Sequence, residues 1–480
     1  RADGGSDLLE PDSKGGWKLV GDIQFSDSLT TAPGGFTVDG KTQYFIDSRG
    51  RDTAALYAID TASGAKTLVA EDARADIGGS LDDPKTGKAQ AVAVDYLKNE
   101  WKVVDPAIAA DMDKLKAIGP GDFSVTARTL DDKTWIVAYS AAETPVAYYR
   151  YVRGGTPEKL FSARPALEGK PLVPMWPQEI KSRDGLTLVS YLTLPKHADA
   201  NADGKADAAV PMVLLVHGGP WARDGYGYSG YTQWLANRGY AVLQVNYRGS
   251  TGFGKAFINK SDQQWAAAMH DDLIDAVDWA VKGGVTTKDQ VAIMGGSYGG
   301  YATLVGLTFT PDAFKCGVDI VGPSNLNTLL ATIPPYWAAF FEQFAKRVGD
   351  PRTEAGKQLL AERSPISHVD KISKPLLIGQ GANDPRVNQA ESDQIVKAMQ
   401  EKKIPVTYVL FPDEGHGFAR PENNKAFNAV TEGFLGQCLG GRSQPIGSDF
   451  AGSSIQVPAG ADGVPGLAEA LKSHTAEVKK

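Results

Sequence analysis

Two patterns of hydrophobic and polar positions divide the chain. In residues 1–170, short β-rich runs are joined by turns of Asp, Gly and Ser, as in consecutive β-hairpins. In residues 171–440, short apolar runs typical of strands are followed by longer apolar stretches that can form helices. The first pattern predicts an all-β region, and the second predicts an α/β domain in which helices connect parallel strands.

The all-β region repeats at a regular spacing. Its predicted strands are residues 43–47, 54–60, 66–70, 89–95, 101–104, 133–140, 146–152 and 158–161. The DGKT turn at 39–42 corresponds to the DDKT turn at 131–134, an offset of two repeats of about 46 residues, close to one propeller blade. The pattern therefore favours part of a β-propeller over an unrelated β-sandwich.

The length of the chain indicates more than one domain. With 480 residues and 42% hydrophobic content, the chain is too long for one domain and can bury sizeable cores. We expect a partial β-propeller of about three to four blades over 1–170 and an α/β-hydrolase domain over 171–440. A Gly-, Ser- and Pro-rich tail follows over 441–480.

A nucleophile elbow is centred on Ser297. Residues 293–300 read IMGGSYGG, so the predicted strand 290–294 runs into a G-x-S-x-G turn followed by an apolar helix over 301–309. A serine hydroxyl is a weak nucleophile, and this sharp turn lifts it clear of the backbone, where a histidine can reach it. The context of the turn predicts Ser297 as a nucleophile.

The partners of this serine are expected downstream in the order Ser, acid, His. Asp384 lies in the loop after the predicted strand 374–379, and His416 follows the predicted strand 406–411. In such a triad the histidine takes the proton of the serine and returns it to the leaving group, while the aspartate fixes the imidazole tautomer.

Other residues of the same types fit these roles less well. Asp384 precedes a proline and has an alternative as a turn residue, and Asp413 and Glu414 are rival acids that lie too near His416 in sequence to end a separate strand. His217 is on a strand-end loop, and the remaining histidines lie in linker, helical or tail contexts: His197, His270, His368 and His474.

Two backbone amides are candidates for the oxyanion hole. The predicted strand 211–216 ends in an HGGP turn, in which the N–H of Gly219 is one donor. The N–H of Tyr298, next to the nucleophile, is the other. His217 precedes the nucleophile and lies on the oxyanion side, so we interpret it as a structural residue that orients this loop.

Composition and charge exclude several classes of function. The formal net charge of −7 argues against a nucleic-acid surface, and no run approaches the roughly 18 apolar residues that a membrane-spanning helix needs. The polar loop 196–209 lacks the spacing and the closing glutamate of an EF-hand calcium loop. We expect no metal or other cofactor, and the triad mechanism requires none.

Taken in order, these motifs resemble the prolyl oligopeptidase group of serine peptidases, in its acylaminoacyl-peptidase and dipeptidyl-peptidase branches. The resemblance rests on the segments 179–195, 217–220, 246–254, 270–279, 295–301, 333–337, 381–387 and 413–418. It implies cleavage of short peptides, with a β-propeller guarding the hydrolase. Dipeptidyl peptidase IV-like members carry a tyrosine at the position of His217, so here two backbone amides, as in acylaminoacyl peptidases, are the expected oxyanion donors.

The resemblance also bears on the propeller. Members of the family usually carry about seven or eight blades, whereas residues 1–170 hold fewer than four. We therefore expect the first part of the propeller to be missing and its exposed blade edges to favour association with another fragment or a second subunit. In dipeptidyl peptidases the acidic residues that hold a substrate's amino terminus come from the propeller, and we expect them in the portion that is missing here. The sequence therefore does not predict exopeptidase specificity.

A disulfide is a further implication of the resemblance. Cys316 and Cys438 have an alternative as two buried thiols, but dipeptidyl peptidase IV-like domains join cysteines at these two positions relative to the serine and the histidine. The implied Cys316–Cys438 bond indicates an oxidising compartment, either the periplasm or the outside of the cell.

A helical excursion over 326–348 is expected above the active site. Its aromatic side chains fit either the core or a substrate pocket, and by position we expect the pocket to include Pro323, Trp337, Phe340, Arg386 and Val387. Arg386 is a candidate for contacting a substrate carbonyl or carboxylate, the alternative being a surface ion pair.

Three classes of function are consistent with the sequence. The first is a serine peptidase that cleaves short peptides, acylaminoacyl- or dipeptidyl-peptidase-like, through an acyl-enzyme on Ser297. The second is a carboxylesterase that uses the same triad on small esters, because serine and oxyanion hole act alike on both substrates. The third is a catalytically silent binding or assembly protein, against which the complete triad argues. The propeller and the resemblance favour the peptidase.

Overall fold

The chain divides into two compact units. The computed structural model describes residues 1–478. Unit 1 comprises Arg1–Pro177 together with two later segments, Gly225–Gln233 and Ser250–Lys260, and unit 2 comprises Gln178–Asp224, Trp234–Gly249 and Ser261–Lys480. Unit 1 is therefore discontinuous in sequence, because the chain returns to it twice.

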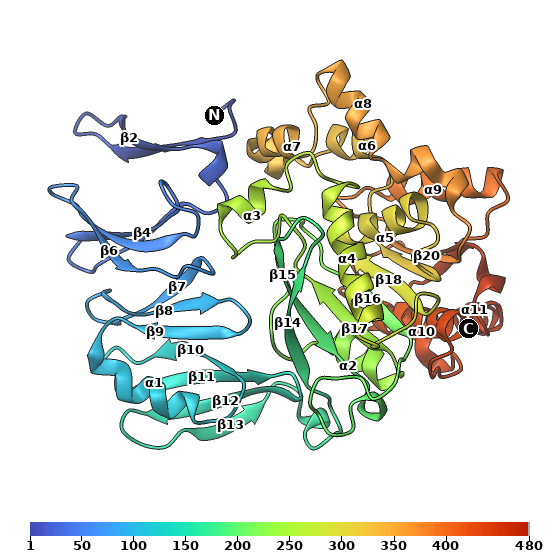
Figure 1. The fold of residues 1–480 in the computed structure, drawn as a ribbon, viewed down its shortest axis with the longest axis horizontal. Coiled ribbons are helices and arrows are strands. Elements are labelled where there is room, and N and C mark those ends of the chain that lie inside the picture. Colours follow the sequence, from blue (N-terminus) through green and yellow to red (C-terminus); the bar gives the residue numbers. More distant parts are fainter. Residues whose placement is uncertain (479–480) are drawn as a thin grey trace. The chain divides into compact units, whose positions relative to one another are not determined.

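Unit 1 contains four antiparallel sheets, which Figure 1 shows one after another in blue to cyan. The sheets are β1 (Ser6–Pro11) and β2 (Trp17–Ile23); β3 (Ala32–Phe36), β4 (Thr42–Asp47), β5 (Ala55–Asp60) and β6 (Lys66–Ala70); β7 (Ile77–Asp82), β8 (Ala89–Asp95) and β9 (Asn99–Val103); and β10 (Asp122–Arg128), β11 (Thr134–Ala141), β12 (Thr144–Val152) and β13 (Glu158–Ser162). The unit also contains two short helices, α1 (Ala109–Lys116) and α3 (Lys255–Asn259).

Consecutive sheets of unit 1 share apolar cores. Tyr44 and Leu56 of the second sheet pack in one cluster with Val92 of the third. A second cluster joins Leu81 of the third sheet to Trp135 of the fourth. Along β11 every second residue is buried, which is the alternation that its sequence predicts. Sheets that face one another in chain order are the arrangement of propeller blades, and the N-terminal region is accordingly propeller-like.

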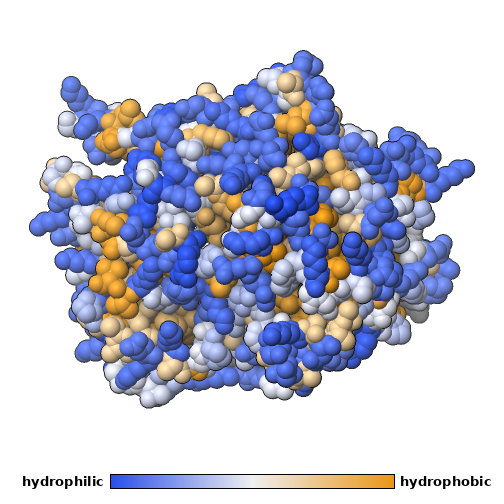
Figure 2. Space-filling view, viewed as in Figure 1, coloured by the Kyte–Doolittle hydropathy of each residue, from blue (hydrophilic) through white to orange (hydrophobic). Residues whose placement is uncertain are grey.

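Unit 1 also exposes large apolar side chains. Among the described residues, the exposed large hydrophobic side chains lie in unit 1 with the exception of Tyr336. Trp17, Leu19 and Val20 of β2 are 68%, 59% and 50% exposed. Figure 2 shows apolar surface on the side of the view that carries the blue and cyan strands of Figure 1.

Unit 2 is built on a nine-stranded sheet in the order β14-β15-β17-β16-β18-β19-β20-β21-β22. The strands are β14 (Met175–Lys181), β15 (Thr187–Thr193), β16 (Met212–Val216), β17 (Ala241–Val245), β18 (Val291–Gly296), β19 (Cys316–Ile320), β20 (Leu376–Gly381), β21 (Thr407–Phe411) and β22 (Gln456–Ala459). The strands from β17 to β21 pair in parallel, whereas β15 and β22 pair antiparallel with β17 and β21. Residues 456–459, in the segment expected as a tail, thus contribute an edge strand.

Helices cover both faces of this sheet, as an α/β-hydrolase fold requires. Gly317 of β19 lies against Thr303 and Leu307 of one helix, so this residue faces that helix. The preceding Cys316 is bonded to Cys438 of another helix. Since successive strand residues point to opposite faces, the two helices lie on opposite sides of the sheet.

Helix α2 (Gly230–Asn237) begins in unit 1 and ends in unit 2. The helices that lie wholly in unit 2 are α4 (Ala268–Lys282), α5 (Tyr298–Phe309), α6 (Leu326–Ala331), α7 (Phe341–Arg347), α8 (Glu354–Glu362), α9 (Gln389–Glu401), α10 (Pro421–Leu439) and α11 (Leu467–Val478). Thr303 and Leu307 belong to α5, and Cys438 belongs to α10. The predicted excursion over 326–348 consists of α6, a 3-10 helix over Pro335–Phe340 and α7.

Candidate active site

Ser297 lies at the turn between β18 and α5. Its backbone has φ 57° and ψ −117°, a left-handed conformation that is strained for a residue with a side chain. A Cβ added at Gly299 would lie 2.0 Å from the carbonyl oxygen of Val216, so this position accepts only glycine. The structure therefore shows a sharp strand-to-helix turn that presents the serine, as the G-x-S-x-G pattern predicts.

Asp384 and His416 are in direct contact. The Nδ1 atom of His416 lies 2.7 Å from Oδ2 of Asp384, whose side chain is buried. Oδ1 of the same carboxylate accepts hydrogen bonds from the backbone N–H groups of Arg386 (2.8 Å) and Val387 (2.9 Å). A carboxylate with these partners holds the proton of the imidazole on Nδ1 and leaves Nε2 free to accept one.

The two loops end at the same edge of the sheet as the serine. Ser297 N donates to the Ile320 carbonyl after β18, Val321 N donates to Gly379, and Ala382 N donates to Phe411. These bonds connect the carboxyl ends of neighbouring parallel strands, so the residues that follow them gather at one edge. Within the described residues, no hydrogen bond joins the Ser297 hydroxyl to His416.

The rival acids are engaged elsewhere. Asp413 is paired with Arg420 and accepts a hydrogen bond from Asn423. Glu414 accepts hydrogen bonds from the backbone of Ala419 and Arg420. Neither carboxylate is bonded to His416 among the described residues, which leaves Asp384 as the acid that the geometry supports.

The HGGP loop packs directly against the elbow. A Cβ built on Gly218 would lie 3.3 Å from Cβ of Ser297, and Gly219 has a positive φ of 123°. The N–H of Tyr298 belongs to the first residue of α5, where backbone donors have no partner inside the helix. The two expected oxyanion donors thus lie on segments that flank the serine.

The side chain of His217 contacts Tyr247 and its own loop. Its ring stacks on Tyr247 with the centroids 4.5 Å apart, and its Nδ1 atom lies 2.8 Å from the Gly218 carbonyl oxygen. Burial lowers the pKa of His217, so the ring is kept neutral. These contacts support the interpretation of His217 as a structural residue of the loop.

A small cavity adjoins Ser297. Its volume is about 40 Å³, and it is lined by Gly219, Trp265, Ser297, Tyr298, Pro323, Leu329, Leu330, Ile333, Trp337, Phe344, Arg386 and Val387. Four of the five residues expected in the pocket are in this lining, and the fifth, Phe340, packs on Trp221 and Phe344 instead.

Sequence reasoning missed several residues of this lining. Trp265 and Phe344 contribute aromatic walls, but Trp265 lies ahead of α4 in a segment whose sequence carries no motif. Arg386 has its guanidinium carbon 5.6 Å from the centroid of Trp337, a cation–π contact, and forms no ion pair within the described residues.

A larger groove of about 1020 Å³ lies at the opposite edge of the sheet. Its lining includes Leu376 and Thr407, at the amino ends of β20 and β21, and Cys438. The groove contains no serine on an elbow and none of the triad residues. Chemistry rather than size therefore places the candidate active site in the smaller cavity.

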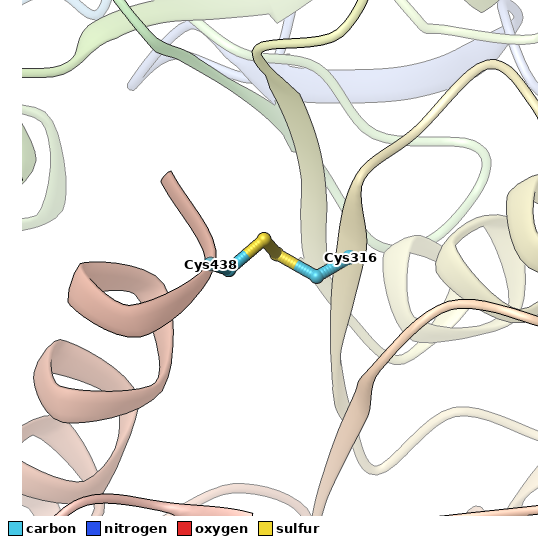
Figure 3. Close-up of a disulfide and its surroundings, with 2 residues drawn as sticks. All are labelled: Cys316 and Cys438. Atoms are coloured by element: carbon cyan, nitrogen blue, oxygen red, sulfur yellow. A yellow bond between two sulfur atoms is a disulfide. The ribbon is translucent and has the colours of Figure 1, made fainter. Parts of the chain in front are cut away.

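Cys316 and Cys438 form a disulfide between β19 and α10 (Figure 3). The Cα atoms are 6.5 Å apart. The resemblance implied this pairing.

Comparison with known proteins identifies the family. Residues 226–442 match the model of the prolyl oligopeptidase family. The chain is 78% identical over 481 residues to dipeptidyl aminopeptidase BIII of Pseudoxanthomonas mexicana, an alignment that covers all of this chain and 70% of that protein. The chain belongs to the prolyl oligopeptidase family. It is accordingly a serine-type peptidase.

Other similar proteins match at lower identity. Dipeptidyl peptidase family member 6 of Caenorhabditis elegans is 43% identical over 442 residues, which are 88% of this chain and 60% of that protein. A Mycobacterium tuberculosis puromycin-hydrolyzing peptidase superposes with a TM-score of 0.72 at 23% identity, covering 93% of this chain and 67% of that one. At this identity the structural match supports the fold alone.

The described residues contain neither a cluster of metal ligands nor a membrane-spanning helix. No group of three or more His, Cys, Asp or Glu side chains in residues 1–478 is arranged to hold a metal ion. Over the same part of the chain, none of the helices has the length and apolar character needed to cross a membrane.

Proposed function

We propose that the chain is a dipeptidyl aminopeptidase that acts on short peptides through an acyl-enzyme on Ser297. The observation that carries the proposal is the hydrogen-bonded pair of Asp384 and His416, which lies at the same edge of the sheet as the Ser297 turn. The two relatives with the highest identities reported above are both named as dipeptidyl peptidases, which favours this specificity over release of N-acylated residues.

The geometry supports the following sequence of steps. Nε2 of His416 takes the proton as the Ser297 oxygen attacks the scissile carbonyl, and Asp384 stabilises the resulting imidazolium. The N–H groups of Gly219 and Tyr298 bind the tetrahedral oxyanion. The imidazolium gives its proton to the leaving amine, which departs as the carbon–nitrogen bond breaks. Water then attacks the ester by the same route and releases the dipeptide.

The cavity beside Ser297 is the proposed site for the side chain next to the scissile bond. Its lining is largely apolar and aromatic, including Pro323, Trp337 and Val387. Such a lining favours an apolar side chain, because burial of apolar surface is its main contribution to binding. Arg386, over the Trp337 ring, is the proposed polar contact to the substrate backbone.

A carboxylesterase is the second candidate. The same serine, histidine and oxyanion donors act on an ester, and the small apolar cavity admits a short acyl group. The family favours the peptidase, but the triad itself does not separate the two reactions.

The disulfide supports an oxidising compartment, the periplasm or the outside of the cell. A bond between Cys316 and Cys438 persists where glutathione and thioredoxin do not reduce it. The exposed apolar side chains of unit 1 support association with another polypeptide.

Three chromogenic substrates test the proposed reaction. A free-amine dipeptidyl anilide, its N-acetylated form and a short-chain ester are compared, with Ser297→Ala as the blank. We expect the free-amine anilide to be cleaved fastest and Ser297→Ala to lose at least about 10⁴-fold in kcat. The unfolding midpoint should stay unchanged, because the Ser297 hydroxyl makes no hydrogen bond with the described residues.

Each other outcome has a distinct meaning. Preferred cleavage of the N-acetylated anilide would move the chain to the acylaminoacyl peptidases. Ester cleavage without anilide cleavage would support the carboxylesterase. Wild-type turnover by Ser297→Ala would contradict the assignment of the nucleophile.

A further inference from the structure

The loop that carries one oxyanion donor is held by the residues that follow a single strand. Asn246 and Tyr247 come directly after β17, and both are fully buried. The hydroxyl of Tyr247 donates a hydrogen bond of 2.9 Å to the carbonyl oxygen of His217, at the start of the HGGP loop. It also lies 3.3 Å from Nδ1 of the same histidine.

The ring of Tyr247 touches both sides of the expected oxyanion hole. One contact is the stack on His217, with an interplanar angle of 14°. Another is with Tyr298, whose ring centroid lies 5.2 Å away at an angle of 28°. Tyr298 supplies one expected donor, and the loop that begins at His217 supplies the other. A single buried side chain therefore contacts both segments.

The far end of the loop is fixed from the same strand. The side-chain amide of Asn246 accepts a hydrogen bond from Asp224 N (2.8 Å) and donates one to the Asp224 carbonyl oxygen (3.2 Å). Nε2 of Gln244 donates to Oδ1 of Asp224 at 2.8 Å. Between these anchors lie Gly218 and Gly219, two residues without a side chain to restrict them.

We propose that Tyr247 is a positioning residue of the oxyanion hole, with Asn246 anchoring the other end of the loop. Tyr247 fixes the carbonyl of His217 and packs on Tyr298, which sets the two donor N–H groups relative to each other. Oxyanion donors act over about 2.7–3.1 Å, so a small displacement of a glycine amide removes most of its effect. Tyr247 is not in the lining of the cavity beside Ser297, and it therefore acts through other residues.

This inference rests on the proposed serine chemistry and adds Tyr247 and Asn246 to it. Burial raises the pKa of Tyr247 well above its ordinary value, so the hydroxyl is a neutral donor at every working pH. Acylation and deacylation both pass through an oxyanion. Loss of the anchor should therefore lower kcat whichever step limits turnover.

Tyr247→Phe tests the proposal because it removes the hydroxyl and keeps the ring stack. We expect kcat to fall about tenfold while KM changes less than about twofold. Affinity for a dipeptide boronic acid, which forms a tetrahedral adduct with serine, should fall by the same factor as kcat/KM. Inhibition by the product dipeptide, which forms no oxyanion, should stay unchanged.

Tyr240→Phe is the matched control. Tyr240 directly precedes the amino end of β17 and is only 1% exposed, so its burial matches that of Tyr247. Removal of the Tyr240 hydroxyl should leave kcat unchanged. If Tyr247→Phe lowers the folded yield, Asn246→Ser releases the other anchor and should give the same loss in kcat at constant KM.

Two results would overturn the proposal. One is wild-type kcat in both Tyr247→Phe and Asn246→Ser. The other is a fall in kcat without the matching fall in boronic-acid affinity, since a merely structural role would produce that pattern. Active Ser297→Ala would instead contradict the serine chemistry itself, so the two failures are distinguishable.

Discussion

Asp384 links the catalytic pair to the substrate cavity. One carboxylate oxygen contacts His416, and the other accepts hydrogen bonds from the backbone of Arg386 and Val387, which line the cavity. One residue thereby sets the histidine tautomer and the position of the cavity wall. The arrangement requires the acid to lie close in sequence to these two residues, which follow Asp384 by two and three positions.

Asp384→Asn should therefore be far more damaging than loss of a nearby surface acid. An amide at this position stabilises the wrong imidazole tautomer, and we expect kcat to fall about 10⁴-fold on the best anilide substrate. Asp413→Asn is the control, because Asp413 is partly exposed and pairs with Arg420, and it should retain kcat within about threefold. Equal losses in the two variants would contradict the assignment of the acid.

Elements with a strong local signal could be predicted from the sequence. The runs that became β16, β18, β20 and β21 are short, apolar and followed by turns of special composition, so the existence of these strands was confirmed. Their ends differ from the predicted ones by up to two residues, as in β18, which was expected over 290–294 and spans Val291–Gly296. The triad candidates sit at such ends, where local pattern and fold agree. The disulfide pairing came from the resemblance and not from the pattern.

Other elements have no such signal. The strand β22 reads QVPA, contains a proline and is only four residues long, and it forms because the edge of β21 offers a partner. The helix α1 has three buried residues within eight, too short a pattern to predict helix from sequence. The cavity walls supplied by Trp265 and Phe344 depend on packing between distant segments, which periodicity does not report.

The disulfide should stabilise the α/β domain without affecting chemistry. The bond joins residues that are 122 positions apart in sequence. Loss of such a bond typically lowers the free energy of unfolding by about 2–4 kcal/mol. Cys316 pairs with Ala292, at the amino end of β18, whereas Ser297 follows the carboxyl end. Replacing both cysteines by serine should lower the unfolding midpoint and leave kcat unchanged.

A reductant provides the matched comparison for this prediction. Reduction should bring the wild-type unfolding midpoint down to that of the double serine variant and leave the variant unaffected. Two alkylated thiols in the unreduced wild-type protein would show that the bond does not form.

At the scale of the whole molecule, the discontinuity of unit 1 is the feature least accessible from sequence. Lys255 and Asp27 belong to the same unit although 228 residues separate them. Gln233 likewise donates hydrogen bonds to the carbonyl oxygens of Ala142 and Val173. A pattern read along the chain assigns these residues to the α/β domain, and only tertiary contacts assign them to the β region. All the segments of unit 1 are therefore present only when the chain has been synthesised up to Lys260.

Lys255→Met should destabilise unit 1 specifically. Nζ of Lys255 lies 2.6 Å from Oδ1 of Asp27, a residue that is only 5% exposed and whose carboxylate also accepts a hydrogen bond from Ser48. Removing the partner of this buried charge should lower the free energy of unfolding by about 1–3 kcal/mol. The loss is smaller than for a fully buried ion pair, because Lys255 is partly exposed. Exchange of the backbone amide hydrogens in β4 and β5 should accelerate, while kcat with an anilide substrate should stay unchanged.

The pH dependence of this effect follows from the sign of the pKa shift. Burial alone would raise the pKa of Asp27, but hydrogen bonds from Lys255 and Ser48 outweigh burial and hold it below its ordinary value. The ion pair therefore stabilises unit 1 above the unfolded-state pKa of aspartate and loses this effect as the pH falls through the folded-state value. The difference between wild type and Lys255→Met should shrink accordingly on acidification. Lys260→Met, which removes an exposed lysine just past the end of α3, should show neither the destabilisation nor its pH dependence, and equal behaviour of the two variants would contradict a role for the Lys255–Asp27 pair.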